Sequence, residues 1–248
     1  MIDLRSLKAL VCLLLTLPAV AQQGGDLQAQ ILYAFQTEDA NRLTELAQNL
    51  SAQLKPELPD VNLRYHLAHA EYRIAKLAGS ARGHEAGAAL EDCIAQLKIV
   101  LKQDVKSVEA MALQSACYYD LAQINPLQAS RLRARANDRL AVAFKLAPHN
   151  PRVVWLRAMD EMSQAKPGSE AQRNAFTQLQ MAGQLFEQSA ATNVEVPGWG
   201  HAETYLALAE QLQSRGDVLG ARNWIEKALI VAPDFKAAQR QLLLIRTP

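Results

Sequence analysis

The sequence contains few of the residues that interrupt regular secondary structure, with 11 glycines and 10 prolines among 248 residues. This composition excludes a collagen-like chain and a broadly disordered one, because both need far more glycine, proline or charge. Aromatic residues make up only 6% of the chain, so a buried core has to be built mainly from leucine and alanine. Alanine-rich contacts let helices approach closely, which favours stacked helices over a sandwich of sheets.

The sequence also lacks the short motifs of common catalytic and cofactor sites. It contains no G-x-S-x-G, no P-loop, no G-x-G-x-x-G and no H-E-x-x-H. Its three cysteines form neither a C-x-x-C nor a C-x-x-C-H motif. His66 and His69 could share one helix face, but a metal site needs a third ligand, and Glu71 points elsewhere on a helix. We therefore predict no catalytic residue, no cofactor and no metal.

Only the N-terminus has the pattern of a targeting segment. Two basic residues precede an apolar run over residues 9–17, and Ala19-Val20-Ala21 forms an A-x-A cleavage pattern. This arrangement is typical of a secretory signal peptide, although a buried first helix is an alternative. The apolar run is too short to span a bilayer as a helix. We expect cleavage after Ala21, and a periplasmic or secreted mature chain of residues 22–248 without a membrane span.

The mature chain would have no net charge. Loss of residues 1–21 removes two of the 26 basic residues and one of the 25 acidic residues, which leaves 24 of each. A neutral chain exerts no overall attraction on nucleic acid or on an anionic membrane. We therefore expect a protein or peptide partner and no nucleic acid. The oligomeric state has no signature in the sequence.

Two cysteines, Cys93 and Cys117, remain after the predicted cleavage. An exported protein meets an oxidising compartment, where a disulfide is stable. The midpoint between them is Val105, inside a predicted turn over residues 103–106. If the flanking helices are antiparallel about this turn, the two thiols lie at the same height. A disulfide and a pair of buried free thiols both remain open from the sequence.

The rest of the chain has the periodicity of helices separated by caps and breakers. Residues 61–77 place apolar side chains on two faces, which predicts a helix packed between neighbours. Asn150 followed by Pro151 is a cap with proline at the first helical position. About ten helices joined by short turns must be antiparallel to their neighbours. The sequence therefore predicts an all-α superhelix, a solenoid of about four to five antiparallel helix pairs.

One family resemblance is visible near the C-terminus, over residues 200–233. Large, small and turn-forming residues recur there at fixed offsets: Tyr205, Leu208, Ala209, Leu212, Gly216, Ala221, Ile225, Ala228 and Pro233. This pattern resembles a tetratricopeptide repeat, a helix-turn-helix unit of 34 residues. A weaker match with the same spacing ends at Pro148, and residues 234–246 resemble a capping helix.

The resemblance implies a function and a set of binding positions. Tetratricopeptide domains usually bind peptides or extended segments in the concave groove lined by the first helix of each repeat. Carried over to this repeat, the groove positions are Glu203, Leu206, Glu210 and Gln213. The alternative is an ordinary solvated face. We expect a periplasmic scaffold or adaptor that is not an enzyme; the alternatives are a cell-envelope hydrolase or lyase, and a structural subunit of an envelope assembly.

Two further features are candidate partner-binding sites. Trp199 and His201 belong to a glycine-rich loop over residues 194–201, and a tryptophan on a loop rim is a frequent anchor for partners. The alternative is a tryptophan packed beneath the repeats.

A basic stripe is the second of these features. Arg131, Arg135 and Arg139 lie four residues apart on one predicted helix. The stripe would bind an anion or an acidic peptide, and the alternative is a solvated face paired with Asp138 and other nearby carboxylates.

Overall fold

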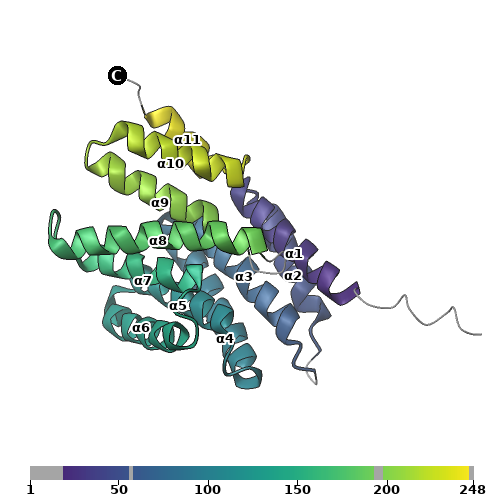
Figure 1. The fold of residues 1–248 in the computed structure, drawn as a ribbon. Coiled ribbons are helices and arrows are strands. Elements are labelled where there is room, and N and C mark those ends of the chain that lie inside the picture. Colours follow the sequence, from purple (N-terminus) through teal and green to yellow (C-terminus); the bar gives the residue numbers. More distant parts are fainter. Residues whose placement is uncertain (1–18, 56–57, 193–197, 246–248) are drawn as a thin grey trace, which may run out of the picture.

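The computed structural model describes residues 19–55, 58–192 and 198–245. Within these ranges the chain forms eleven α-helices and no strand. Successive helices pack as antiparallel pairs that stack into a superhelix, with one last helix after five pairs (Figure 1). The all-α superhelix predicted from the sequence is confirmed. None of the helices described here is long and apolar enough to cross a membrane.

The helix boundaries lie close to the predicted caps and breakers. The helices are α1 (Ala19–Gln36), α2 (Ala40–Gln53), α3 (Val61–Ala78), α4 (Gly83–Gln103), α5 (Val108–Ile124), α6 (Ala129–Leu146), α7 (Pro151–Gln164), α8 (Glu170–Thr192), α9 (His201–Ser214), α10 (Val218–Val231) and α11 (Lys236–Leu244). Residues 1–18, which make up most of the predicted signal peptide, lie outside the described residues, as do residues 194–197 of the predicted loop.

Side-chain caps fix the start of five helices, one of them α8, where the hydroxyl of Ser169 accepts a hydrogen bond from the N–H of Gln172. Asp39, Asp60, Asn150 and Asp217 each accept a hydrogen bond from a backbone N–H two or three residues further on. A cap of this kind stabilises a helix by about 1 kcal/mol. These local signals explain why the helix starts could be read from the sequence.

The inner helices are buried on more than one side. Helix α3 packs against α1 and α2 on one side and against α4 on the other. The two apolar faces predicted for this segment therefore both have partners. Alanines are frequent in the core, and Ala136, Ala143, Ala221 and Ala228 are completely buried. Small side chains at these positions let the paired helices approach closely.

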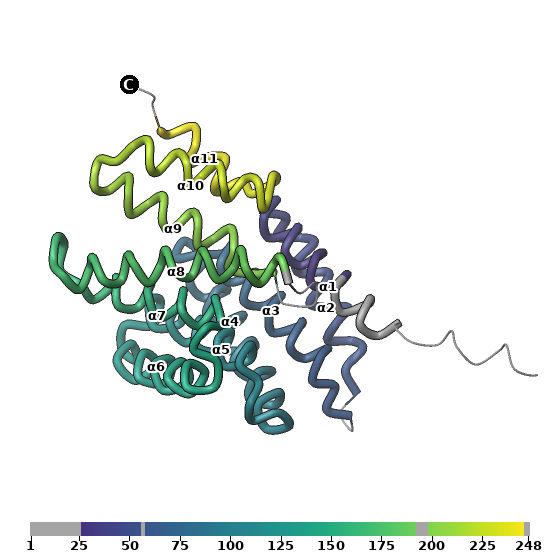
Figure 2. The backbone as a smooth tube through the Cα atoms, in the orientation of Figure 1, coloured from purple at the N-terminus to yellow at the C-terminus, as the bar shows by residue number. Residues whose placement is uncertain are grey.

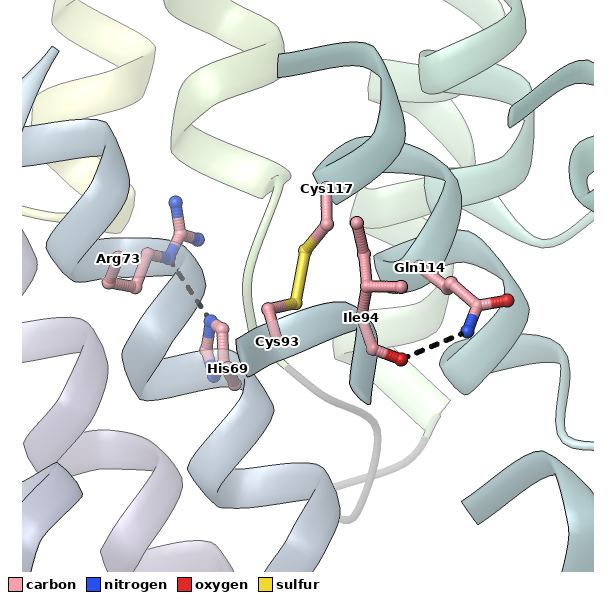
Figure 3. Close-up of a disulfide and its surroundings, with 6 residues drawn as sticks. All are labelled: His69, Arg73, Cys93, Ile94, Gln114 and Cys117. Atoms are coloured by element: carbon pink, nitrogen blue, oxygen red, sulfur yellow. Dashed lines mark hydrogen bonds between the residues drawn. A yellow bond between two sulfur atoms is a disulfide. The ribbon is translucent and has the colours of Figure 1, made fainter. Parts of the chain in front are cut away.

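A disulfide joins two neighbouring helix pairs. Cys93 in α4 and Cys117 in α5 are bonded, with their Cα atoms 6.8 Å apart and both side chains completely buried (Figure 3). Beside the bond, Gln114 of α5 donates a hydrogen bond to the carbonyl of Ile94 in α4. A crosslink between residues 24 apart in sequence stabilises the fold by about 3 kcal/mol.

The two ends of the superhelix touch each other. The ring of Phe35 at the end of α1 lies 6.1 Å from the ring of Phe235, which precedes α11. Arg240 of α11 donates two hydrogen bonds, of 2.8 and 2.6 Å, to the carboxylate of Glu38 in the turn after α1. Figures 1 and 2 show this junction where α1, in purple, meets the yellow C-terminal helices. The helices therefore form a closed ring.

Candidate functional site

The inner helices of the ring surround one cavity of about 640 Å³, which we call the central cavity. Helices α3, α5, α7 and α9 contribute most of its wall, and the rest comes from the junction of α1 with α11 and from Arg133 of α6. A volume of this size is in the range of ligand-binding pockets in proteins. The cavity exists because every second helix of the superhelix faces the same side.

Aromatic side chains from several elements line the central cavity. They are Phe35, Tyr72, Tyr119, Trp155 and Phe235. Leucine, methionine and alanine side chains fill the spaces between them. The wall can therefore contact apolar groups and the aliphatic stems of long side chains.

Charged side chains line the same cavity, and most of them are paired. The pairs are Arg73 with Glu203, Lys76 with Asp120, and Arg240 with Glu38. Their N–O distances are 2.5, 3.1 and 2.6 Å. Each pair joins two different elements of the chain.

Arg73 is the most deeply buried of these charges. Its side chain is 1% exposed, and its Nη2 lies 2.5 Å from Oε1 of Glu203. Its Nε donates a hydrogen bond of 3.1 Å to Nε2 of His69 (Figure 3), and its guanidinium lies 4.1 Å from the ring centroid of Phe35. The other oxygen of Glu203 accepts the N–H of Gly200. Both carboxylate oxygens of Glu203 are thus used within the chain, and this residue fastens α9 to α3.

The structure brings three of the four predicted groove positions to the central cavity. Glu203, Leu206 and Glu210 line it, as expected for residues at spacings of three and four on an inner helix. The fourth, Gln213, is hydrogen-bonded to the side chain of Gln241 in α11. Gln213 therefore contributes to the contact between α9 and the last helix.

Trp199 does not lie on an exposed rim. Its side chain is completely buried, and its Nε1 donates a hydrogen bond of 3.0 Å to the hydroxyl of Tyr65. Its ring packs edge-on against Trp155 and Tyr72, at centroid distances of 6.1 and 6.4 Å. The partner-anchor hypothesis is wrong for this residue, because no surface of the indole is available to a partner. The alternative, a tryptophan beneath the repeats, is what the structure contains.

His201 also belongs to helix packing. Its ring stacks on Phe186 of α8 at 5.2 Å, and its Nε2 is hydrogen-bonded to the hydroxyl of Tyr205. Partial burial lowers the pKa of His201. The half-buried imidazole therefore joins α8 to α9, away from the central cavity.

The arginine stripe lies on the outer helix α6. Arg131, Arg135 and Arg139 are all exposed, and none of them forms an ion pair within the described residues. The suggested pairing with Asp138 is therefore not seen there. The arginine of α6 that does line the central cavity is Arg133.

The burial of a second cation, Arg152, was not predicted from the sequence. Its side chain is 1% exposed, and its Nη1 lies 3.2 Å from Oε1 of Glu109. Asn150 donates a hydrogen bond of 2.7 Å to the same oxygen. An arginine in the first turn of a helix is ordinarily exposed to solvent. The apolar residues that follow, from Val153 onwards, were the only indication in the sequence that this end of the helix is buried.

The two histidines considered as metal ligands are buried. Burial lowers the pKa of His66 and lowers the pKa of His69 further, to which Arg73 also contributes. Within the described residues there is no group of three or more His, Cys, Asp or Glu side chains placed to hold a metal ion.

No protein-family model matches the sequence, and no curated protein is significantly similar to it.

Proposed function

We propose that this protein is a tetratricopeptide-type binding scaffold that holds a peptide or an extended segment of a protein partner in the central cavity. The observation that supports this proposal is the convergence of the inner helices on one aromatic and charged cavity. Leu206 and Glu210, two positions that the family resemblance assigns to the groove, lie in its wall. The alternating arrangement of inner and outer helices suits such a role, because it leaves one concave face free for a ligand.

Two smaller hollows share wall residues with the central cavity. A hollow of about 370 Å³ adjoins it at Tyr119 and Asp160, which line both. Another of about 260 Å³ adjoins it at Lys76 and Asp120.

We propose that the protein acts in the periplasm or outside the cell. The signal-peptide pattern before Ala21 supports export. The buried disulfide between Cys93 and Cys117 also supports it, because structural disulfides persist mainly in oxidising compartments.

An array of synthetic peptides tests the binding function. The mature chain should retain a subset of peptides, and Leu206→Glu, which places a charge in the cavity wall, should weaken their binding at least about tenfold. Leu219→Glu is the matched control, since this leucine of α10 is 64% exposed and lies outside the central cavity. Melting curves of both variants establish that they are folded. Failure to retain any peptide, or equal losses in the two variants, would rule out the proposal.

The alternative of an envelope hydrolase or lyase has one supporting observation. Glu210 lies in the cavity wall, and partial burial raises its pKa, as a general acid requires. A Glu210→Gln variant would abolish turnover of an envelope polymer in an enzyme. A binding scaffold would release no fragments from an envelope polymer, whether or not Glu210 is replaced. Measuring the release of such fragments therefore separates the two functions.

A further inference from the structure

The outer helix α6 concentrates positive charge on a chain whose charges otherwise nearly balance. It contains five basic residues and one acidic residue, a net charge of +4, whereas the whole sequence has a net charge of +1. Arg131, Arg135 and Arg139 are exposed and form no ion pair within the described residues. The guanidinium of Arg135 lies 6.0 Å from the ring centroid of Tyr118, a contact that leaves its charge uncompensated. Such a helix attracts anions locally even though the chain as a whole does not.

The three sides of α6 have different surroundings. One side packs on α5 and consists of the buried residues Leu132, Ala136, Leu140 and Ala143. A second side lines the central cavity and the hollow of about 370 Å³ with Arg133, Asn137, Ala141 and Phe144. The third side, which we call the outer flank, carries Arg131, Arg135, Arg139, Val142 and Leu146 at spacings of three and four residues.

The outer flank is turned away from the proposed peptide site. At about 100° per residue, its side chains lie roughly opposite those that line the hollows. None of its five residues lines the central cavity or either adjoining hollow. Figure 1 shows α6 at the periphery of the superhelix, beside α5 and α7. A large object can therefore approach this flank without closing the cavity.

Exposed apolar side chains accompany the arginines. Val142 and Leu146, at the C-terminal end of the flank, are each 44% exposed. Leu127 lies four residues before Arg131, in the 3₁₀ turn Pro126–Gln128, and is 98% exposed. Transfer of such side chains from water to an apolar phase is favourable. The basic centre of the flank is thus bordered by apolar groups at both ends.

We infer that the outer flank of α6, together with Leu127, docks on a membrane surface that contains anionic lipids. Such a surface presents negative headgroups directly above apolar chains, so a peripheral helix that binds it needs both basic and apolar side chains. The arginines bind the headgroup phosphates, which match the fork of a guanidinium, and the three apolar side chains enter the boundary below. Arg131 and Leu146 are about 22 Å apart along the helix, a span that suits a flat surface.

An acidic peptide, the ligand that the sequence suggested for the stripe, matches only half of this arrangement. It would pair with the arginines and leave the apolar side chains, Leu127 above all, in water. The membrane inference uses both halves. It also does not depend on the central cavity, because it rests on different residues.

Co-sedimentation of the mature chain with lipid vesicles at low salt tests the inference. One preparation is phosphatidylcholine alone, and the other has equal parts of phosphatidylcholine and phosphatidylglycerol. The chain should bind the anionic vesicles about 100-fold more tightly, because each of the three arginines contributes about fivefold near an anionic surface. The triple variant Arg131→Gln, Arg135→Gln and Arg139→Gln should remove most of this difference. High salt should do the same, because it screens exposed charges.

A second triple variant is the matched control. Arg42→Gln, Arg82→Gln and Arg222→Gln remove the same number of charges from other exposed arginines, which are 47%, 52% and 42% exposed. This control should weaken vesicle binding by less than about threefold, since its charges lie outside the flank. Leu127→Ser should weaken binding to anionic vesicles by about fivefold. Melting curves establish that all variants are folded.

Poly-glutamate is the probe for an acidic protein partner. If the mature chain binds poly-glutamate but not the anionic vesicles, the membrane inference is overturned and the stripe is a site for acidic segments. Equal binding to both vesicle preparations, equal losses in the two triple variants, or no loss in Leu127→Ser would also overturn it. The peptide array decides the proposed function separately, whatever the vesicles show.

Discussion

Replacing Trp199 by alanine should lower the free energy of unfolding far more than a substitution in an exposed loop would. The indole is completely buried where α3, α7 and the start of α9 meet. The guanidinium of Arg152 lies 5.5 Å from its ring centroid. Truncation would open a cavity among three aromatic or imidazole rings and remove the donor that Tyr65 accepts.

The magnitude follows from burial and from the hydrogen bond. Large-to-small substitution of a buried tryptophan costs about 3 to 5 kcal/mol. Leaving the Tyr65 hydroxyl without its indole donor adds about 1 kcal/mol. At about 2 to 4 °C per kcal/mol for a chain of this size, the melting temperature should fall by about 10 to 20 °C.

Chemical denaturation of the mature chain with its disulfide intact measures this loss. The matched control is Trp224→Ala, because Trp224 is only partly buried and contacts Tyr205 and Lys227. The control substitution should lower the free energy of unfolding by about 1 kcal/mol. A loss at Trp199 no larger than the loss at Trp224 would refute the burial of the indole in the ring.

Two further predictions concern charged groups. A double-mutant cycle on Glu38 and Arg240 should give a coupling energy of about 1 kcal/mol or less, because both side chains are substantially exposed. A coupling energy above about 3 kcal/mol would contradict the solvent exposure of this ion pair. Burial, and to a lesser extent the charge of Asp92, raises the pKa of Glu71 from 4.5 to about 7 in the folded protein. The folded state therefore binds this proton more tightly than the unfolded state. As a result, the free energy of unfolding should fall as the pH rises from 4.5 to 7. Glu71→Gln should raise the free energy of unfolding by about 1 to 2 kcal/mol above pH 7 and leave it unchanged below pH 4.5. The control Glu91→Gln, at an exposed carboxylate of the outer helix α4, should leave it unchanged at every pH. A stabilisation by Glu71→Gln that does not depend on pH would exclude the titration of Glu71 as its cause.

The helices were predictable because their signals are local. Asp60 and Asn150 cap the helices that follow them, and an apolar period of three to four residues marks each buried face. The resemblance over residues 200–233 implied groove positions at Leu206 and Glu210, and both line the central cavity. Such features depend on neighbours within a few turns, so a single sequence contains enough information to find them.

The roles of the buried charges were not predictable, because they depend on contacts between distant helices. Glu203 has the pattern of a groove residue, yet Arg73, 130 residues away in sequence, uses one of its oxygens. Arg73 and Arg152 look like ordinary exposed arginines when only their own helices are considered. Their burial follows from the angle at which successive pairs stack, and no short motif encodes that angle.

Contact between α1 and α11 has a consequence for how this protein can change over evolution. An open repeat protein lengthens its ligand surface by duplicating a unit. Here an inserted helix pair would separate Phe35 from Phe235 and break the two bonds of Arg240. Adding a unit would therefore cost the contacts that join the first and last helices, so the junction disfavours lengthening by duplication.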